Sequence, residues 1–310
     1  MKSKRSAAIR IPMEGLEIYI LSDGYFGIGN PQPILAPEIK KEQVQEALSA
    51  LYLAESDYEM PITTVLIKKG NHYILVDTGE GYHDPVNAGW LQNSISELGI
   101  TPEAITDILI THAHRDHIGG ILSKEGAKMY PNAKYYIAEP EYNFWTSEDK
   151  DFSKSKMPST SYPTGEIQTE TLTSIQHDLE IFKPGETLFS CIRTESAPGH
   201  TPGHIIFHIF SGNQTITHLV DVVHSPLLVN HPDWGTQWDV NFEEGIATRK
   251  RIFDNCANDK RMVMTCHLPW PGVGYIHKLE NGWNWIPKAQ SDPYTIKIGF
   301  GTDKGLLLTR

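Results

Sequence analysis

A short run of histidines and aspartates carries the clearest chemistry in the sequence. His112, His114, Asp116 and His117 lie within six residues and are followed by the glycine pair at 119–120. In extended backbone, residues two apart point to the same side, so the imidazoles of His112 and His114 can converge on one metal ion. Asp116 and His117 are neighbours that point apart, which suits a second ion. The alternative is a surface histidine cluster, and the apolar strand directly before the run argues against it.

The stretch THAHRDHIGG at 111–120 resembles the His-X-His-X-Asp-His signature of the metallo-β-lactamase superfamily. That family has further ligands in a fixed order: a His in a Pro-Gly-His turn, an Asp after a strand, and a late His. The sequence offers His200, Asp221 and His267 at the corresponding places. The resemblance therefore implies an α+β protein with the αββα sandwich fold and a metal-dependent hydrolase activity.

The resemblance also assigns each ligand to one of two divalent ions. One ion takes three histidines, the other takes one aspartate and two histidines, and a further aspartate bridges both. In that order, the residues are His112, His114 and His200; Asp116, His117 and His267; and Asp221. A bridging hydroxide would attack the substrate, with Asp221 holding the bridge and Asp116 assisting the leaving oxygen. The donors favour zinc, with manganese, iron and cobalt as alternatives.

Four more residues gain candidate roles from the resemblance. Asp77, in a Val-Asp-Thr-Gly turn, would lie beneath the ligands and orient them, although it could simply cap a turn. Tyr82 and Trp145 would be aromatic walls of the substrate pocket. Some lactonases of the family use a Tyr shortly after the bridging Asp to touch the substrate carbonyl. Here that role falls to His224 or is absent.

Three sequence segments in the second half of the chain narrow the range of expected activities. Segments 231–234, 247–251 and 267–274 look like those of the methyl parathion hydrolase subgroup, which also contains N-acyl-homoserine lactonases. We therefore expect an enzyme that opens N-acyl-homoserine lactones, a quorum-quenching reaction. Organophosphate triester hydrolysis is the first alternative, as a main or side activity. Thioester hydrolysis, as in glyoxalase II, would need a basic cluster in the C-terminal tail, and a non-catalytic binding protein would not need an intact ligand set.

Hydrophobic periodicity indicates the elements that position these residues. In the first half we expect a strand that ends in a turn at 22–24 and a helix that begins near Ile118, just after the signature. The expected strands are 16–21, 63–68, 72–76, 105–111, 133–138, 188–194, 205–210, 215–223 and 262–265, with helices at 91–98 and 242–257. The first of these elements read as half of an αββα sandwich.

We expect one metallo-β-lactamase-like domain over 1–310, with a helical extension at about 30–57 and an irregular inserted loop region at about 141–180. A helix opening at Pro37 would carry an apolar stripe. The stripe residues are Val44, Leu48, Leu51 and Tyr52. This stripe could pack on the protein's own core or on a second subunit, and a homodimer is the working expectation. A long insertion between framework strands is a common place for substrate specificity.

Composition and charge exclude several classes of protein. The 310 residues are 39% hydrophobic, and no stretch approaches the length of a membrane span. A net charge of −11 without a basic patch argues against a nuclease. The run Arg249-Lys250-Arg251 reads as a solvated helix face. Cys191, Cys256 and Cys266 read as reduced and buried, so we expect a cytoplasmic enzyme with a small-molecule substrate, or a periplasmic or secreted one if a leader was removed.

Overall fold

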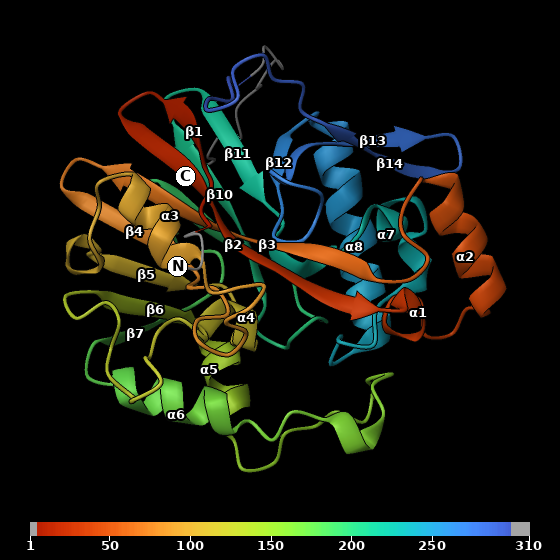
Figure 1. Cartoon of the computed structure of the whole chain (residues 1–310), viewed down its shortest axis with the longest axis horizontal. Helices are drawn as coiled ribbons and strands as arrows, with labels where there is room; N and C mark the ends of the chain where they lie inside the picture. Colours follow the sequence, from red (N-terminus) through yellow and green to blue (C-terminus); the bar gives the residue numbers. More distant parts are fainter. Residues whose placement is uncertain (1–4, 299–310) are drawn as a thin grey trace.

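Two seven-stranded mixed sheets face each other in the computed structural model, which describes residues 5–298 (Figure 1). The first half of the chain forms one sheet, with its strands side by side in sequence order. These are β1 (Ala8–Met13), β2 (Leu16–Gly29), β3 (Tyr58–Lys69), β4 (His72–Val76), β5 (Asp107–Ile110), β6 (Lys134–Ala138) and β7 (Leu179–Phe182). The C-terminal tail discussed above runs partly beyond this range, and residues 299–310 lie outside the described part.

The second half forms the other sheet, again with sequential neighbours side by side. Its strands are β8 (Thr187–Leu188), β9 (Ile192–Ser196), β10 (Ile205–Ser211), β11 (Gln214–His218), β12 (Met262–Met264), β13 (Val273–Leu279) and β14 (Gly282–Pro287). Helices cover the outer faces: α3, α5 and α6 lie on the first sheet, and α7 and α8 on the second (Figure 1). The expected αββα sandwich is confirmed.

The helices are short except for α8, the longest of those described. Their bounds are α1 (Pro31–Ile34), α2 (Lys41–Ala50), α3 (Leu91–Glu97), α4 (Arg115–Ile118), α5 (Glu139–Thr146), α6 (Glu166–Ile175), α7 (Pro226–Asn230) and α8 (Phe242–Asn258). Over residues 5–298, none of them has both the length and the apolar composition that a membrane span requires.

Side chains along each strand point alternately to its two faces, and those on the inner faces form the core between the two sheets. In β10, Ile205, Phe207 and Ile209 point into the interface between the sheets, whereas Ile206 packs with the cluster beneath α7 and α8. This is the period-two pattern of a strand that is covered on both faces. Each fully buried side chain of this size contributes about 1.5–3 kcal/mol. Both faces of the strand therefore fix its register.

Backbone hydrogen bonds join the two sheets at one edge. The amide of Ile205 donates to the carbonyl of Thr111 (3.3 Å), and the amide of Thr63 donates to the carbonyl of Cys266 (3.2 Å). Thr111 and Cys266 each precede an expected metal ligand. The loops that carry the ligands are thus bonded to the opposite sheet.

Two local predictions in the first half were wrong. The turn expected at 22–24 is a bulge inside β2, where Gly24 adopts φ 106° and the strand continues to Gly29. The helix expected to begin near Ile118 ends there instead, as α4. A side chain at Gly120 would lie 2.1 Å from the carbonyl oxygen of Thr78, so the glycine pair permits close backbone contact rather than helix formation.

Helices α1 and α2 occupy the extension expected at 30–57. Val44 and Leu48 are completely buried within a single chain, so α2 needs no second subunit to cover them. Tyr52 follows the helix in a left-handed conformation (φ 55°) and is 97% exposed, so its place in the apolar stripe was wrong. The apolar stripe therefore gives no support for a homodimer.

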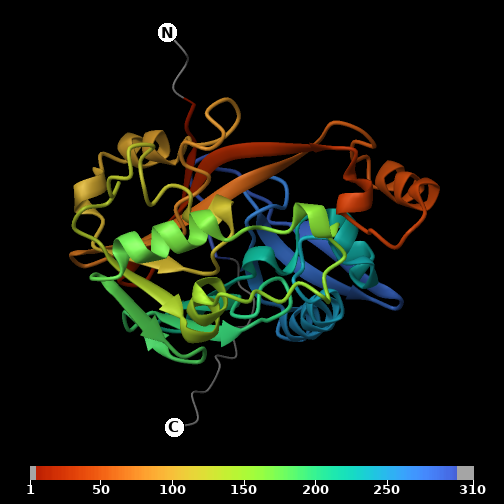
Figure 2. The same cartoon turned by 90° about the horizontal axis from the view of Figure 1, so that it is seen from below.

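The region expected to be an irregular loop contains two helices, α5 and α6, so that description was wrong in part. Between these helices, a crossing segment at residues 147–165 runs from the first half of the protein toward the second and back (Figure 2). The hydroxyl of Ser155 donates to the carbonyl of Gln237 (3.1 Å), and the amide of Phe242 donates to the carbonyl of Lys154 (3.1 Å). This crossing segment forms one side of the cavity described below.

Candidate active site

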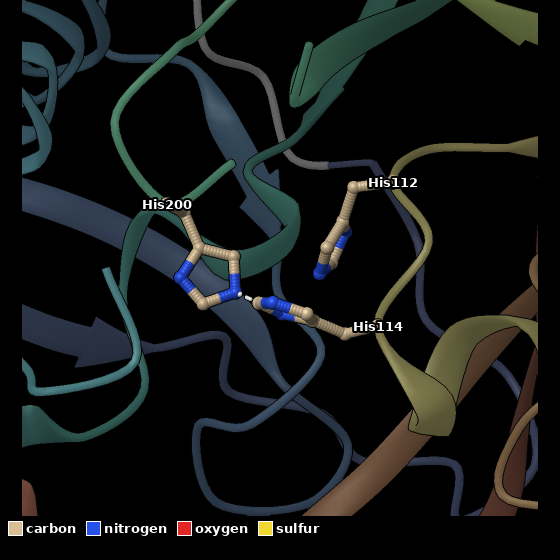
Figure 3. Close-up of side chains that lie close together, drawn as sticks. All are labelled: His112, His114 and His200. Atoms are coloured by element: carbon tan, nitrogen blue, oxygen red, sulfur yellow. Dashed lines mark hydrogen bonds between the residues drawn. The ribbon is translucent and has the colours of Figure 1, made fainter. Parts of the chain in front are cut away.

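The structure brings all of the expected metal ligands together at the edge where the ligand loops meet. Their donor atoms form two groups, with all atoms of a group within 4.8 Å of one another. One group is His112, His114 and His200, and the other is Asp116, His117, Asp221 and His267. Figure 3 shows the first group, in which Nδ1 of His114 and Nε2 of His200 lie 2.9 Å apart. The sequence pattern predicted the same division, except that it shared Asp221 between the two groups; Asp221 also forms a third, overlapping group with His200 and His224.

Oxygen atoms hold the outer nitrogen of most of these rings. Nδ1 of His117 bonds to Asp77 Oδ2 (2.8 Å), Nδ1 of His200 to Asp239 Oδ1 (3.0 Å) and Nδ1 of His267 to the carbonyl of Pro61 (2.9 Å). In a neutral ring, a proton on Nδ1 leaves the Nε2 lone pair free to face the centre. These contacts favour the neutral tautomer that binds a metal through Nε2. Burial opposes protonation, but nearby carboxylates, Asp221 above all, raise the pKa of all three rings, so an ion would displace protons from them.

The carboxylate of Asp221 lies at the middle of both groups. Its Oδ2 is 3.3 Å from Nε2 of His117, His200 and His267, and 3.6 Å from Nε2 of His112. The chain reaches this position because β11 ends at His218, earlier than expected, and is followed by a helical turn at Val220–Val222. The assignment of 219–223 to a strand was wrong.

Several buried polar atoms in the cluster have no hydrogen-bond partner among the described residues. They are Nε2 of His112, Nε2 of His117 and Oδ1 of Asp221. Unpaired buried polar atoms are costly, and one ion bound by each group would satisfy them. Burial also lowers the pKa of His112 far below its usual range, so the ring is neutral at pH 7 and can bind a metal without losing a proton. The residues present fit two divalent ions.

Asp77 lies beneath this centre, in the place expected from the sequence. Its carboxylate accepts bonds from the Thr111 amide (2.9 Å), the Thr111 hydroxyl (2.7 Å) and His117. Its backbone is left-handed (φ 61°), a strained conformation for a residue other than glycine. Such strain is held by surrounding structure and is frequent at functional sites.

A buried ion pair that no sequence motif indicated, Asp239 and Arg249, lies next to the ligands. Asp239 bonds to the ligand His200, and its other oxygen lies 3.7 Å from the Arg249 guanidinium. Arg249 is 1% exposed and donates to the carbonyls of Val222 (2.7 Å) and Pro232 (3.1 Å). The interpretation of Arg249 as part of a solvated face was wrong. A single basic run cannot reveal that one member turns inward while its neighbours stay exposed.

The other candidate pocket residues differ in their placement. His224 lines the cavity above the cluster, and its Nε2 is 3.4 Å from Asp221 Oδ2. Trp145 is fully buried behind His114, with ring centroids 5.9 Å apart, and Tyr82 stacks on His83 at the surface. Among the described residues, neither Trp145 nor Tyr82 lines that cavity.

The cavity has a volume of about 650 Å³ and opens onto the metal ligands. Phe26 and Trp238 form part of its apolar wall; Phe26 packs edge-on against the ligand His267 at 5.4 Å, and Trp238 contacts His224. Met157 and Ile167, from the crossing segment and α6, complete that wall. Sequence reasoning missed all four of these residues, because no local motif marks them.

The rim of the cavity is acidic. It carries Asp84 and Glu166, while its single arginine, Arg115, pairs with the buried Glu80 at 2.6 Å. Burial raises the pKa of Glu80 to about 7, and the charge of Asp116 adds to the shift, whereas Arg115 opposes it. The rim therefore offers no unpaired cation among the described lining residues.

Comparison with known proteins identifies the family. Residues 57–278 match the metallo-beta-lactamase superfamily. The chain belongs to this superfamily. One relative, the uncharacterized protein YobT of Bacillus subtilis, is 29% identical to this chain over 150 residues. The aligned part is 47% of this chain and 56% of YobT. The chain spans about half the length of the curated relatives it matches.

Solved structures extend the similarity over nearly the whole chain. AidC, a dizinc quorum-quenching lactonase in complex with a homoserine product, superposes with a TM-score of 0.87 at 33% identity, covering 93% of this chain and 99% of AidC. The hydrolase AbOPH of the beta-lactamase superfamily has a TM-score of 0.84 at 25% identity, with the same coverage. Family and neighbours together support metal-dependent hydrolysis.

Proposed function

We propose that this protein is a dinuclear zinc hydrolase that opens the lactone ring of N-acyl-homoserine lactones. The observation that carries the proposal is the cavity of about 650 Å³, which joins the ligand cluster to an apolar wall. A lactone ring at the cluster and an acyl chain along Phe26, Ile167 and Trp238 would use both parts. The similarity to AidC, a lactonase with a homoserine product, supports the same substrate class.

In the proposed reaction, water adds to the lactone carbonyl carbon, the ring C–O bond breaks, and the ring oxygen takes up a proton. Bound ions would polarise the carbonyl and lower the pKa of a coordinated water. Asp221 would help to hold both ions, and Asp116, whose side chain is 19% exposed and lines the cavity, would pass a proton of the attacking water to the ring oxygen. Burial lowers the pKa of His224 to about 4, so its ring is neutral and can donate a hydrogen bond to the substrate carbonyl.

The acidic rim favours a neutral substrate. Asp84 and Glu166 would repel an anion, and the charge of Arg115 is already paired with Glu80. Nucleic acids and thioesters of glutathione are anionic, whereas an acyl lactone carries no charge until its ring opens. Charge therefore ranks the lactone above the thioester that the sequence left as an alternative.

A phosphotriester is the second candidate, because it is also neutral and the same centre could polarise a phosphoryl oxygen. The deciding experiment compares kcat/KM for a long-chain N-acyl-homoserine lactone and for methyl parathion, on protein whose metal content has been measured. We expect a lactone value within the enzymatic range of about 10⁴–10⁸ M⁻¹s⁻¹ and a lower phosphotriester value. The reverse ranking would replace the proposal by organophosphate hydrolysis. No turnover of either substrate with both ions bound would refute it.

A further inference from the structure

A buried glutamate on α5 contacts both of the loops that carry the first group of ligands. Glu141 is completely buried, and its two oxygens accept four hydrogen bonds. Oε1 accepts from the amide of Ala113 (2.8 Å) and the indole of Trp145 (2.7 Å). Oε2 accepts from the hydroxyl of Thr201 (2.5 Å) and the amide of Gly203 (3.0 Å).

These donors lie beside the ligands. Ala113 is the residue between His112 and His114, and Thr201 directly follows His200. The two loops come from different sheets, one after β5 and the other after β9. One carboxylate therefore holds together the three histidines of the first group, although it touches none of them.

The surroundings are built for close approach. A side chain at Gly203 would lie 2.0 Å from the backbone nitrogen of Glu141, so the second loop can reach α5 only with glycine at that place. The bonded indole of Trp145 packs across His114, with an angle of 71° between the rings. Burial raises the pKa of Glu141, and the four donors oppose that shift. A proton on either oxygen would face only donors.

We propose that Glu141 is a positioning residue that sets the spacing of His112, His114 and His200 and so determines the affinity of one ion. The inference depends on the proposed ligand set and not on the identity of the substrate. Second-layer partners of metal ligands typically change metal affinity by about 10–100-fold when they are replaced. The loop residues that Glu141 bonds, Ala113, Thr201 and Gly203, adjoin only ligands of the first group, whereas Asp116 and His117 lie further along in α4. The effect should therefore fall mainly on one ion of the pair.

The test measures zinc binding by competition with a chromophoric chelator, on the full chain prepared without metal. Glu141→Gln keeps the shape but replaces one acceptor oxygen with an amide donor, and we expect one of the two ions to bind at least about tenfold more weakly. Thr201→Val removes a single donor and should weaken the same ion to a smaller extent. With cobalt in place of zinc, the visible spectrum of only that ion should change.

The matched control is Asp107→Asn, which alters another buried carboxylate, at the far end of β5, that bonds to His72 and Thr106. It should leave both zinc affinities unchanged. Unchanged affinities in Glu141→Gln, or equal weakening of both ions, would overturn the inference. If that variant does not fold, Thr201→Val decides by the same criterion. A parent protein that binds fewer than two ions would instead refute the ligand set proposed above, and this inference with it.

Discussion

Single residues at the centre hold conformations that only the surrounding structure can maintain. Val220, a β-branched residue directly before Asp221, has φ 51°, and Asp77 beneath the ligands has φ 61°. Left-handed backbone is rare for such residues and costs about 1–3 kcal/mol each. The amide of Asp221 is held in turn by Nε2 of His204 (3.2 Å), whose Nδ1 donates to Ala197. The strained backbone at Val220 and the bond from the Asp221 amide to His204 together orient the carboxylate of Asp221 toward the ligands.

Replacement of that carboxylate is the first prediction. Asp221→Asn removes a negative charge from the middle of both ligand groups, and we expect kcat/KM to fall by several orders of magnitude, on the order of 10³. Circular dichroism should show an unchanged fold, and metal analysis should accompany the assay. Asp233→Asn, at an exposed carboxylate paired with Lys250, is the control. Near-full activity of Asp221→Asn with both ions bound would show that the residue does not bridge.

The second prediction concerns acid stability. His218 is buried and stacked on Phe207, and burial lowers its pKa from 6.5 to about 3. The unfolded chain takes up this proton below pH 6.5 and the folded chain does not. Stability is therefore complete above pH 6.5 and falls as the pH drops toward 3, by up to about 1.4 kcal/mol per pH unit for this group.

His218→Asn tests this dependence, because the Asn oxygen can still accept from the amide of Val220, as Nδ1 does at 3.0 Å. The variant should be less stable at every pH, since stacking is lost. The slope of unfolding free energy against pH between 6.5 and 3, from urea titrations of metal-free protein, should be shallower by one proton. Parallel slopes for the two proteins would contradict the assignment.

At this scale the sequence predicted the residues that form local patterns. The ligand positions follow fixed motifs, and the structure brings those residues together. Glu141, Asp239 and Arg249 belong to no local pattern, because their partners lie far away along the chain and only the fold makes them neighbours. Trp145 illustrates the same limit: its aromatic type was noticed, but its direction behind His114 depends on the bond to Glu141.

At the scale of elements, the bulge in β2 connects the strand to the substrate cavity. Beyond Gly24 the strand carries Phe26 to the apolar wall and against His267. A side chain at Gly24 would lie 2.2 Å from the carbonyl oxygen of Asn87, in addition to the strain of φ 106°. The shape of the strand therefore depends on this glycine.

The third prediction follows. Gly24→Ala should lower the free energy of unfolding by about 1–3 kcal/mol, because both the backbone strain and the collision must be absorbed. Gly27→Ala in the same strand is the control: its added carbon would meet nothing within 4 Å, and its φ is not left-handed. Chemical denaturation of both variants measures the difference. Equal stabilities would show that the bulge adapts without cost.

The inserted region shows why some elements were missed. Proline normally interrupts a helix, yet Pro140 lies in the first turn of α5, where the missing amide proton costs nothing. Gly165, the residue before helix α6, has a left-handed backbone and offers no side chain to cap the helix. The sequence therefore lacks the capping residue that usually marks the start of a helix. Strands β2 to β6 and β9 to β12, in contrast, were predicted from their apolar, β-branched runs, whereas β1, β7, β13 and β14 were missed.

At the scale of the whole molecule, the centre combines the two halves of the chain. Four ligands come from the segment that follows β5 of the first sheet, and three come from loops of the second sheet. In that order they are His112, His114, Asp116 and His117; and His200, Asp221 and His267. Each group of donor atoms contains members from both halves. An ion bound by either group therefore stabilises the packing of one sheet on the other.

The fourth prediction is a large loss of stability when metal is removed. At a free zinc concentration 1,000 times the dissociation constant, each ion should contribute about 4 kcal/mol. The melting temperature should fall on chelation and return when zinc is added back. Asp221→Asn, which disturbs both groups, should show a smaller shift. A melting temperature that does not depend on zinc would argue against ions that join the halves.

The division of ligands between the halves also orders events during synthesis. A nascent chain that has emerged as far as β7 already carries His112, His114, Asp116 and His117, but neither donor group is complete. The first group is completed by His200 and the second only by His267, well after the second sheet has begun. A chain can therefore bind both ions only after the ribosome has synthesised His267, the last ligand in the sequence.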